Sequence, residues 1–313
     1  MPTRRSPRKG SLQFWPRKRA KKFLPSVNWR AVNGPAKNLK GFICYKAGMA
    51  SLQVKDNTLN SMTKGKNIFI PATILECPPL KIFSVRFYNN NKLIGEVLAE
   101  GLDKELKRNV KIPKKGKSFD FIKKDYDDIK IICYSLVKKT RIKKTPDLCE
   151  IALAGSKEEK INFVKNVLGK EIFISDAFEK GQLIDIRGLT KGKGLSGPVK
   201  RFGIGLKEHK SEKGVRRPGS LGPWHPARVT FRAPQAGQLG MFSRIIYNCK
   251  IIDVGKPRGE LNNIKNFGNI KTDYILVYGS VQGPAKRQLL ITSPLRITKK
   301  QAKKNYEVLE IMR

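Results

Sequence analysis

A basic interval of 58 residues, 187 to 244, most constrains how this chain folds. It holds thirteen Lys or Arg against two Glu, together with eleven Gly and five Pro. Glycine and proline disfavour the interiors of helices and strands. The interval shows neither the apolar spacing of a helix nor the apolar alternation of a strand. Because a compact domain rarely carries so long a loop unless the loop is functional, we expect a folded protein from which a basic loop emerges.

The charge of the whole chain predicts the partner of this loop. The 313 residues include 65 Lys and Arg against 25 Asp and Glu, which gives a net charge of +40. A hydrophobic content of 39% is enough for a core, so the chain is not a disordered tail. The charge exceeds what solubility requires and would make the free chain repel itself. We therefore expect a polyanion, nucleic acid, as the partner.

The first 40 residues are predicted to be an extension that orders on RNA. They hold twelve Lys or Arg and no acidic residue, with Phe14, Trp15, Phe23 and Trp29 spaced among the charges. Such a segment lacks the apolar period needed to fold alone, but its cations can follow phosphates while its aromatic rings stack on bases. The alternative is a disordered basic tail, which the two tryptophans disfavour.

Globular patterning begins near Gly41 with four short apolar runs separated by turn residues. The runs are GFICYKAGM, IFIPATILEC, LKIFSVRFY and KLIGEVLA. Their β-branched and aromatic content predicts antiparallel strands. Pro71 in the second run and Pro78-Pro79 after it indicate an edge strand or a bulge.

From about 101 to 171 the pattern becomes mixed α and β. Ser156-Lys157-Glu158-Glu159 has the capping-box form, and Gly169 stands where the following helix would end. IKIICYSLV before it is either a buried strand or a helix segment. EIFISDAFEKGQLIDIRGL, IIYNCKIIDV and TDYILVYGSV then return to a strand pattern. The predicted fold is mainly β, a barrel of strands from both sides of an α+β insertion.

Several classes of protein are disfavoured by what the chain lacks. Its five cysteines are scattered and never in C-x-x-C, and His209 and His225 have no ligand at metal spacing. Asp125-Tyr126-Asp127-Asp128 is interpreted as a solvated acidic turn. No apolar run approaches the roughly 18 residues of a membrane span, and no signal peptide follows the basic N-terminus. We expect a soluble cytoplasmic protein with no catalytic site, metal, cofactor or small-molecule substrate.

Gly192-Lys193-Gly194-Leu195-Ser196-Gly197 fits the dinucleotide-binding pattern G-x-G-x-x-G. That fingerprint requires a helix after the third glycine, and PVKRFGIG has no helical apolar spacing. We interpret the match as accidental. Beside Lys191, Lys193, Lys200 and Arg201, these glycines are expected to let the backbone approach phosphates closely. A solvated flexible linker is the alternative.

The stretch GSLGPWHPARVTF, residues 219 to 231, places Trp224 between Pro223 and His225-Pro226. Core tryptophans usually have apolar neighbours at strand or helix period, and Trp224 does not. We predict a rigid apical loop that presents one large aromatic side chain. The alternative is a tryptophan that anchors the loop to the barrel.

Six motifs taken together resemble the universal third protein of the large ribosomal subunit, in its archaeal and eukaryotic branch. They are RRSPRKGSLQFWPRKRA, KGFICYKAGM, GLTKGKGLSGPVKRFG, GPWHPARV, GQLGMFSR and GSVQGPAKRQLL, in that order along nearly the whole chain. The chain departs from the family at Met241-Phe242, where Tyr-His is expected, and at Ala50-Ser51, where Thr-His is common. Two other classes are alternatives. A nuclease or RNA-modifying enzyme would require a clustered acid, His or Cys site, which the sequence does not offer, and a chromatin-type binder would be expected to use duplex-shape contacts in place of single-strand stacking.

The resemblance implies a six-stranded barrel of the translation-protein type, an extension threaded into large-subunit rRNA, and a central basic finger. In that family the finger carries a tryptophan, here Trp224, toward the peptidyl transferase centre, where RNA performs the chemistry. The family protein acts early in subunit assembly, so the implied partners are large-subunit rRNA and neighbouring large-subunit proteins in the cytoplasmic ribosome. The expected division is 1–40 extension, 41–100 first barrel part, 101–171 α/β insertion, 172–187 barrel continued, 188–244 finger, 245–298 last barrel part and 299–313 C-terminal tail.

The residues expected to contact RNA are mainly Lys and Arg of the extension and of the finger. They are Arg4, Arg5, Arg8, Arg17, Lys18, Arg19, Lys21, Lys22, Lys191, Lys193, Lys200, Arg201, Arg216, Arg217, Trp224, His225, Arg228, Arg232, Gln238 and Arg244.

Overall fold

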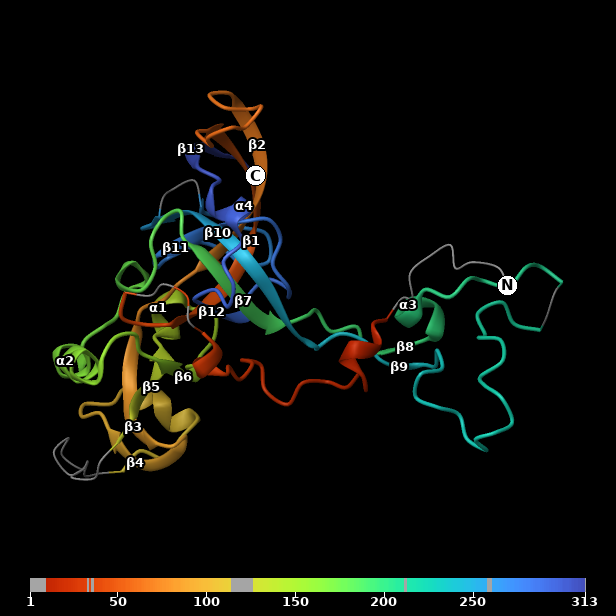
Figure 1. Ribbon diagram of the computed structural model, residues 1–313, viewed down its shortest axis with the longest axis horizontal. Helices are drawn as coiled ribbons and strands as arrows, with labels where there is room; N and C mark the ends of the chain where they lie inside the picture. Colours follow the sequence, from red (N-terminus) through yellow and green to blue (C-terminus); the bar gives the residue numbers. More distant parts are fainter. Residues whose placement is uncertain are drawn as a thin grey trace. The chain divides into compact units, whose positions relative to one another are not determined.

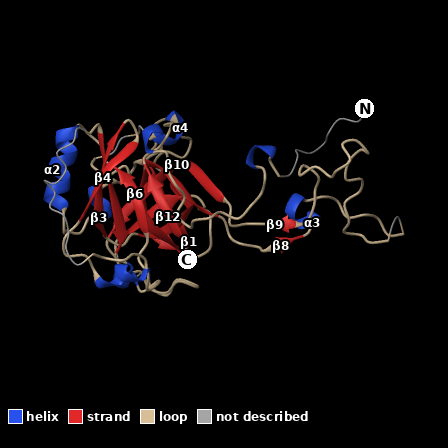
Figure 2. Cartoon of the chain, turned by 90° about the horizontal axis from the view of Figure 1, so that it is seen from below, coloured by secondary structure: helices blue, strands red, loops and turns tan. Residues whose placement is uncertain are grey.

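The computed structural model describes residues 10–32, 34, 37–113, 126–210, 213–257 and 261–312. The chain divides into two units. One, which we call the β unit, comprises Leu24–Gly188 and Arg244–Arg313; the other, the basic unit, comprises Met1–Phe23 and Leu189–Ser243. The long strands lie in the β unit (Figures 1 and 2).

Seven strands of the β unit form one sheet with the order β12-β7-β10-β11-β2-β1-β13. Their bounds are β12 Gln288–Thr292, β7 Leu183–Leu189, β10 Ser243–Gly255, β11 Tyr274–Tyr278, β2 Asn67–Glu76, β1 Gly41–Asp56 and β13 Tyr306–Met312. β1 also pairs with β12, from Gly41 opposite Thr292 to Tyr45 opposite Gln288. Strands from the two ends of the chain therefore lie side by side.

β2 has partners on both sides only from Ala72 to Glu76, and from Asn67 to Pro71 it pairs with β1 alone, which agrees with the predicted edge around Pro71. Ala72, opposite Tyr278, is the last β2 residue paired with β11, and Pro71 follows directly outside that ladder. On its other side Pro71 lies opposite Ser51 of β1. The missing N–H is tolerated because the two-sided pairing of β2 ends at this residue.

A second sheet of four strands has the order β4-β3-β5-β6. Its strands are β3 Leu80–Asn89, β4 Lys92–Leu98, β5 Asp128–Ser135 and β6 Leu148–Ala152. β3 and β4 were expected in the first barrel part, yet β3 pairs with β5 of the insertion from Leu80 to Tyr88. The run IKIICYSLV is thus a strand as far as Ser135, and its last residue, Val137, begins the single turn of α1, Val137–Thr140.

The predicted helix is α2, Lys157–Val167, and its capping box is present. The Glu159 N–H donates to Ser156 Oγ over 3.4 Å, and the Ser156 N–H donates to Glu159 Oε2 over 2.9 Å. Gly169, with φ +79°, ends the segment as predicted.

Two parts of the chain differ from the expected elements. Only Leu183–Leu189 of EIFISDAFEKGQLIDIRGL is a strand, and Ile174–Asp176 forms a 3-10 helix instead. The expected C-terminal tail contains α4, Lys299–Ala302, and β13, which pairs antiparallel with β1. β13 forms because alternate residues such as Ile311 turn toward the core.

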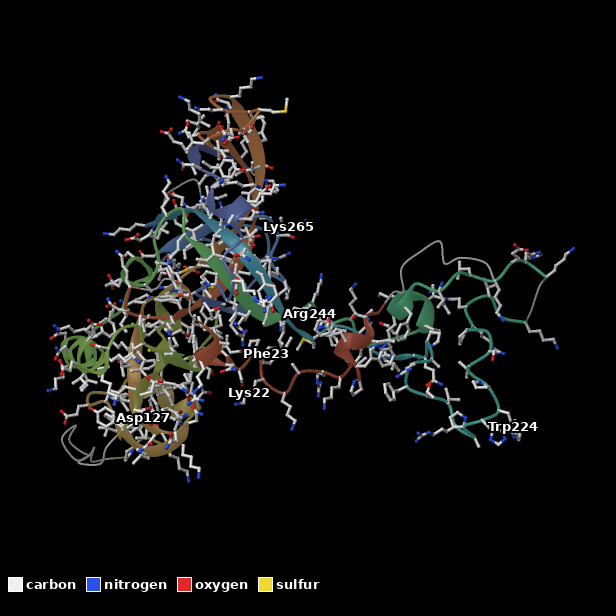
Figure 3. The ribbon with its side chains drawn as sticks, viewed as in Figure 1. Lys22, Phe23, Asp127, Trp224, Arg244 and Lys265 are labelled. Carbon is white, nitrogen blue, oxygen red and sulfur yellow. The ribbon has the colours of Figure 1, made fainter. Side chains whose placement is uncertain are left out.

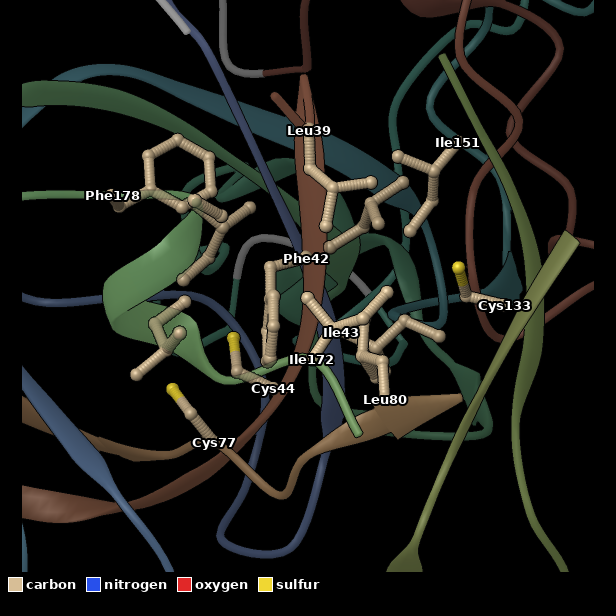
Figure 4. Packing of buried hydrophobic residues seen from close by; sticks show 14 of the residues in the cluster. Leu39, Phe42, Ile43, Cys44, Cys77, Leu80, Cys133, Ile151, Ile172 and Phe178 are labelled. Atoms are coloured by element: carbon tan, nitrogen blue, oxygen red, sulfur yellow. The ribbon is translucent and has the colours of Figure 1, made fainter. Parts of the chain in front are cut away.

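The core of the β unit includes residues that were assigned to the RNA-threading extension. Leu39 packs in the cluster around Phe42 shown in Figure 4 and forms a bridge with Leu153. Trp29 is 6% exposed, and its ring lies 2.7 Å from where a side chain on Gly41 would begin. The expectation that Trp29 stacks on RNA bases is therefore wrong, because its ring is already buried in the protein.

Candidate nucleic-acid interface

Positive charge is concentrated in the basic unit. Its two segments contain twenty Lys and Arg against two Glu, whereas the remainder of the chain contains 45 against 23. Ion pairs such as Arg86 with Glu96 and Lys160 with Asp128 lie in the β unit. The two acidic residues of the basic unit cannot neutralise its cations, so the unit presents a strong positive field.

A small backbone frame holds the two ends of the finger together. β8, Leu195–Ser196, pairs antiparallel with β9, Gly237–Gln238. The Lys193 N–H donates to the Leu239 carbonyl over 2.9 Å, and the Leu239 N–H donates to the Gly194 carbonyl over 2.9 Å. The finger therefore leaves and returns through one closed ribbon (Figure 1).

A one-turn helix, α3, spans Pro198–Phe202, although no helix was predicted there. Pro198 occupies its first turn, where a missing N–H costs nothing, and Gly203 ends it with φ +62°. These two residues were the available signal. The dinucleotide interpretation still fails, because β8 is a two-residue antiparallel strand and not part of a parallel βαβ unit.

Aromatic side chains far apart in sequence build a small core for the basic unit. The Trp15 ring stacks on Phe202 at a centroid distance of 5.7 Å and lies 5.8 Å from Phe231. Phe202 is 5% exposed and Phe242 is 9% exposed. Trp15 thus packs against the finger, which corrects the expectation that it stacks on bases. At Met241-Phe242, where the chain departs from the family motif, Phe242 serves as a core residue.

Two arginines predicted to bind RNA also contact this core. The Arg17 guanidinium lies 5.2 Å from the Phe202 ring centroid and donates to the Arg201 carbonyl over 3.2 Å. Arg201 donates to the carbonyls of Gln238 and Gln235 at 3.1 and 3.0 Å. Burial lowers the pKa of Arg201. Gln238 is also engaged, because its amide donates to the Leu239 and Gly240 carbonyls.

The other predicted residues are arranged as follows. The exposed side chains are those of Lys18, Arg19, Lys21, Lys22, Lys191, Lys193, Lys200, Arg216, Arg217, Trp224, His225, Arg228 and Arg232. Arg244 belongs to the β unit and is half-buried. Arg4, Arg5 and Arg8 lie outside the described residues.

Trp224 is 84% exposed. Figure 3 shows it on an outer bend of the finger. It lines a cavity of about 320 Å³ with Pro223, Pro226 and Arg228, all from the same short loop. The loop therefore presents an aromatic face beside a cation, which supports the apical loop over the anchoring tryptophan.

Gly240→Ala is expected to destabilise the β8–β9 ribbon, with a free-energy cost of about 1–3 kcal/mol or more. Gly240 has φ +79°, and an added Cβ would meet the Lys191 carbonyl oxygen at 2.0 Å. Gly194→Ala is the matched control, because Gly194 has φ +61° but no atom within 4 Å of an added Cβ. Hydrogen exchange at the Lys193 and Leu239 amides should accelerate strongly in the first variant and much less in the second. Equal protection in both would contradict this packing.

Within the described residues, no group of three or more His, Cys, Asp or Glu side chains could hold a metal ion. No helix in the same part of the chain is both long and apolar enough to cross a membrane.

A strand-rich unit joined to an exposed cationic unit is typical of a protein that meets a polyanion. A model of the family described as Ribosomal protein L3 matches residues 1–121 and 111–311. The large ribosomal subunit protein uL3 of Methanocaldococcus jannaschii is 38% identical over 308 residues, covering 93% of this chain and 91% of that protein. The protein of the same name from Picrophilus torridus is 38% identical over 314 residues, covering 96% and 94%.

A third similar protein, uL3 of Archaeoglobus fulgidus, is 37% identical over 308 residues, with 93% of this chain and 92% of that protein covered. The chain therefore belongs to the ribosomal protein L3 family, whose members are structural ribosomal proteins and not enzymes. This confirms the resemblance identified from the sequence motifs.

Proposed function

We propose that the protein is a structural constituent of the large ribosomal subunit and binds large-subunit rRNA through its basic unit. The observation that carries the proposal is the excess of twenty Lys and Arg over two Glu in that unit. The relatives that cover nearly the whole chain are named large ribosomal subunit proteins. We infer that it lies in the cytoplasmic ribosome, in contact with rRNA and neighbouring subunit proteins.

The chemistry of this binding is charge neutralisation combined with close backbone approach. Exposed Lys and Arg of the finger pair with phosphates and release counterions, which makes affinity fall steeply with salt. Gly194 and Gly197, where an added Cβ would have no atom within 4 Å, leave the backbone open beside Lys191 and Lys193, whereas Gly192 faces the Met241 side chain. Arg17 and Arg201 contribute indirectly, because they hold the finger in the conformation that presents these cations.

We further infer that six strands close into the barrel implied by the family resemblance. The strand order β12-β7-β10-β11-β2-β1 and the additional β1–β12 pairing support a closed ring. A closed barrel leaves no open edge among these six strands. It would supply the rigid base from which the finger departs between β7 and β10.

The finger is proposed to extend toward the peptidyl transferase centre, with Trp224 as its stacking surface, and the protein to act early in subunit assembly. Support for the first role comes from the motif match and from the 84% exposure of Trp224. An aromatic side chain displayed in this way is suited to stack on a base. RNA performs the chemistry, and the protein positions it.

Trp224→Ala is expected to leave subunit assembly largely intact but to alter aminoacyl-tRNA accommodation or antibiotic sensitivity. The change removes a stacking contact worth about 1–3 kcal/mol without touching the core of the basic unit. Trp224→Phe, which keeps an aromatic face, is the matched control and should restore most of the function. Elongation kinetics measured with purified variant ribosomes provide the test. Unchanged kinetics in Trp224→Ala would assign the side chain a packing role.

A further inference from the structure

We propose that the β unit carries a second phosphate-binding site, built from basic residues around α1, which takes the backbone of folded RNA. This inference rests on the proposed function and deepens it, because it adds an RNA contact outside the finger and outside the residues predicted from the sequence.

The site is a cavity of about 490 Å³ between two short elements. One wall is the 3-10 helix Lys104–Arg108, and the other is α1 with the loop after it. Glu105, Arg108, Lys138, Arg141, Lys143 and Lys144 line the cavity. Five of these six charged side chains are positive.

Side-chain contacts fix both walls in place. Asn109 Nδ2 donates to the Pro146 carbonyl over 2.6 Å, which ties the 3-10 helix to the loop. The Tyr45 hydroxyl, on β1, donates to Asp147 Oδ2 over 2.5 Å. Asp147 also pairs with Lys143, whose ammonium group lies 5.6 Å from the Tyr45 ring centroid. The loop is therefore anchored to the main sheet and is not a loose surface turn.

Internal ion pairs satisfy only part of the positive charge. Lys138 pairs with Glu105 at 3.4 Å, and Lys143 pairs with Asp147. Among the described residues, Arg108, Arg141 and Lys144 make no ion pair, and all three are exposed. Three uncompensated cations at one cavity repel one another and favour an anionic ligand.

Phosphodiester groups are the anions that fit this arrangement best. Arg108 and Arg141 offer planar forks of donors, and Lys144 offers a point charge, a combination suited to adjacent phosphates. None of the described residues that line the cavity is aromatic, so it would read the backbone and not bases. The run KKTRIKK, residues 138–144, carries five cations in seven positions and is the sequence signal for this site.

Chemical footprinting of the intact protein tests the site directly. Modification of Arg108 and Arg141 by phenylglyoxal, and of Lys144 by acetylation, is quantified by mass spectrometry in the free protein, with large-subunit rRNA, and with inorganic pyrophosphate. Arg216 and Arg217 of the finger are the internal reference. We expect rRNA to reduce modification of the cavity residues as strongly as that of the finger residues.

Three other protection patterns would each overturn the proposal, and each would have a different meaning. Protection of the finger alone would leave the proposed function standing and remove the second site. Protection of neither region would contradict rRNA binding itself. Protection of the cavity by pyrophosphate but not by rRNA would identify a site for small anions.

A triple variant, Arg108→Gln with Arg141→Gln and Lys144→Gln, provides an independent measure. In a plot of the logarithm of the rRNA-binding constant against the logarithm of the salt concentration, the slope of this variant should be shallower by about 2–3. Each lost phosphate contact reduces that slope by about 0.9. The control replaces Lys64, Lys66 and Arg296, three exposed cations elsewhere in the β unit. Equal slopes in the two variants would show that only general charge had been removed.

Discussion

Removing residues 1–40 is expected to prevent the β unit from folding, whereas removing residues 1–23 should leave it folded. Trp29, Val32 and Leu39 are 6%, 0% and 0% exposed in its core. Deleting side chains of this kind costs about 2–5 kcal/mol each. Their combined loss is comparable with the whole stability of a typical domain, about 5–15 kcal/mol. The sequence pattern instead assigns all 40 residues to an extension that orders on RNA.

Circular dichroism and chemical denaturation of the two truncated proteins measure this difference. The full chain carrying Trp29→Ala is a useful intermediate, and its free energy of unfolding should fall by about 3–5 kcal/mol. If the protein without residues 1–40 unfolded cooperatively at the same denaturant concentration as the full chain, the assignment of Trp29, Val32 and Leu39 to the core would be wrong.

Neutralising six exposed cations of the finger is expected to weaken rRNA binding by about a thousandfold or more at physiological salt. The six substitutions, each to Gln, are at Lys191, Lys193, Lys200, Arg216, Arg217 and Arg228. Each phosphate contact contributes about 0.9 to the slope of the logarithm of the binding constant against the logarithm of the salt concentration, so the magnitude of that slope should decrease by about 5. Filter binding of the protein to large-subunit rRNA across a salt series provides both quantities.

A charge-matched variant separates site-specific binding from general attraction. It carries Gln at Lys64, Lys66, Lys92, Lys256, Lys265 and Arg296, all exposed in the β unit. We expect it to lose far less affinity than the finger variant. Comparable losses in the two proteins would mean that the finger is not the main binding surface.

Local patterns in the sequence predicted the individual elements well. The four runs after Gly41 form β1 to β4, and the Ser156 capping box begins α2. The partition of strands between sheets was not predictable in the same way. An apolar run indicates that a strand has a buried face, but not which strand covers or pairs with it. β3 and β4 were therefore assigned to the wrong sheet.

Aromatic residues among charges posed a similar difficulty. Trp15 and Trp29 stand in the same basic segment, yet Trp29 is buried in the β unit and Trp15 packs on Phe202 and Phe231. Only Trp224 is displayed as predicted. Sequence spacing cannot separate these cases, because the rings that contact Trp15 belong to Phe202 and Phe231, 187 and 216 residues further along the chain.

The candidate site shows why residue type alone assigns roles poorly. Arg201 and Lys200 are adjacent basic residues, but Arg201 donates to the Gln238 and Gln235 carbonyls while Lys200 is exposed. Arg17 similarly lies against Phe202. A guanidinium group is suited both to phosphates and to carbonyls or aromatic faces. Geometry was needed to assign these two arginines to the frame of the finger.

The central claim is that the finger and Trp224 contact large-subunit rRNA, and crosslinking in cell extract tests it most directly. The Trp224 loop and the surrounding interval 187–244 are crosslinked to RNA, and the attached RNA is sequenced. The account predicts crosslinks concentrated in the peptidyl transferase region of large-subunit rRNA. Crosslinks scattered over many RNAs, or found on DNA, would contradict it.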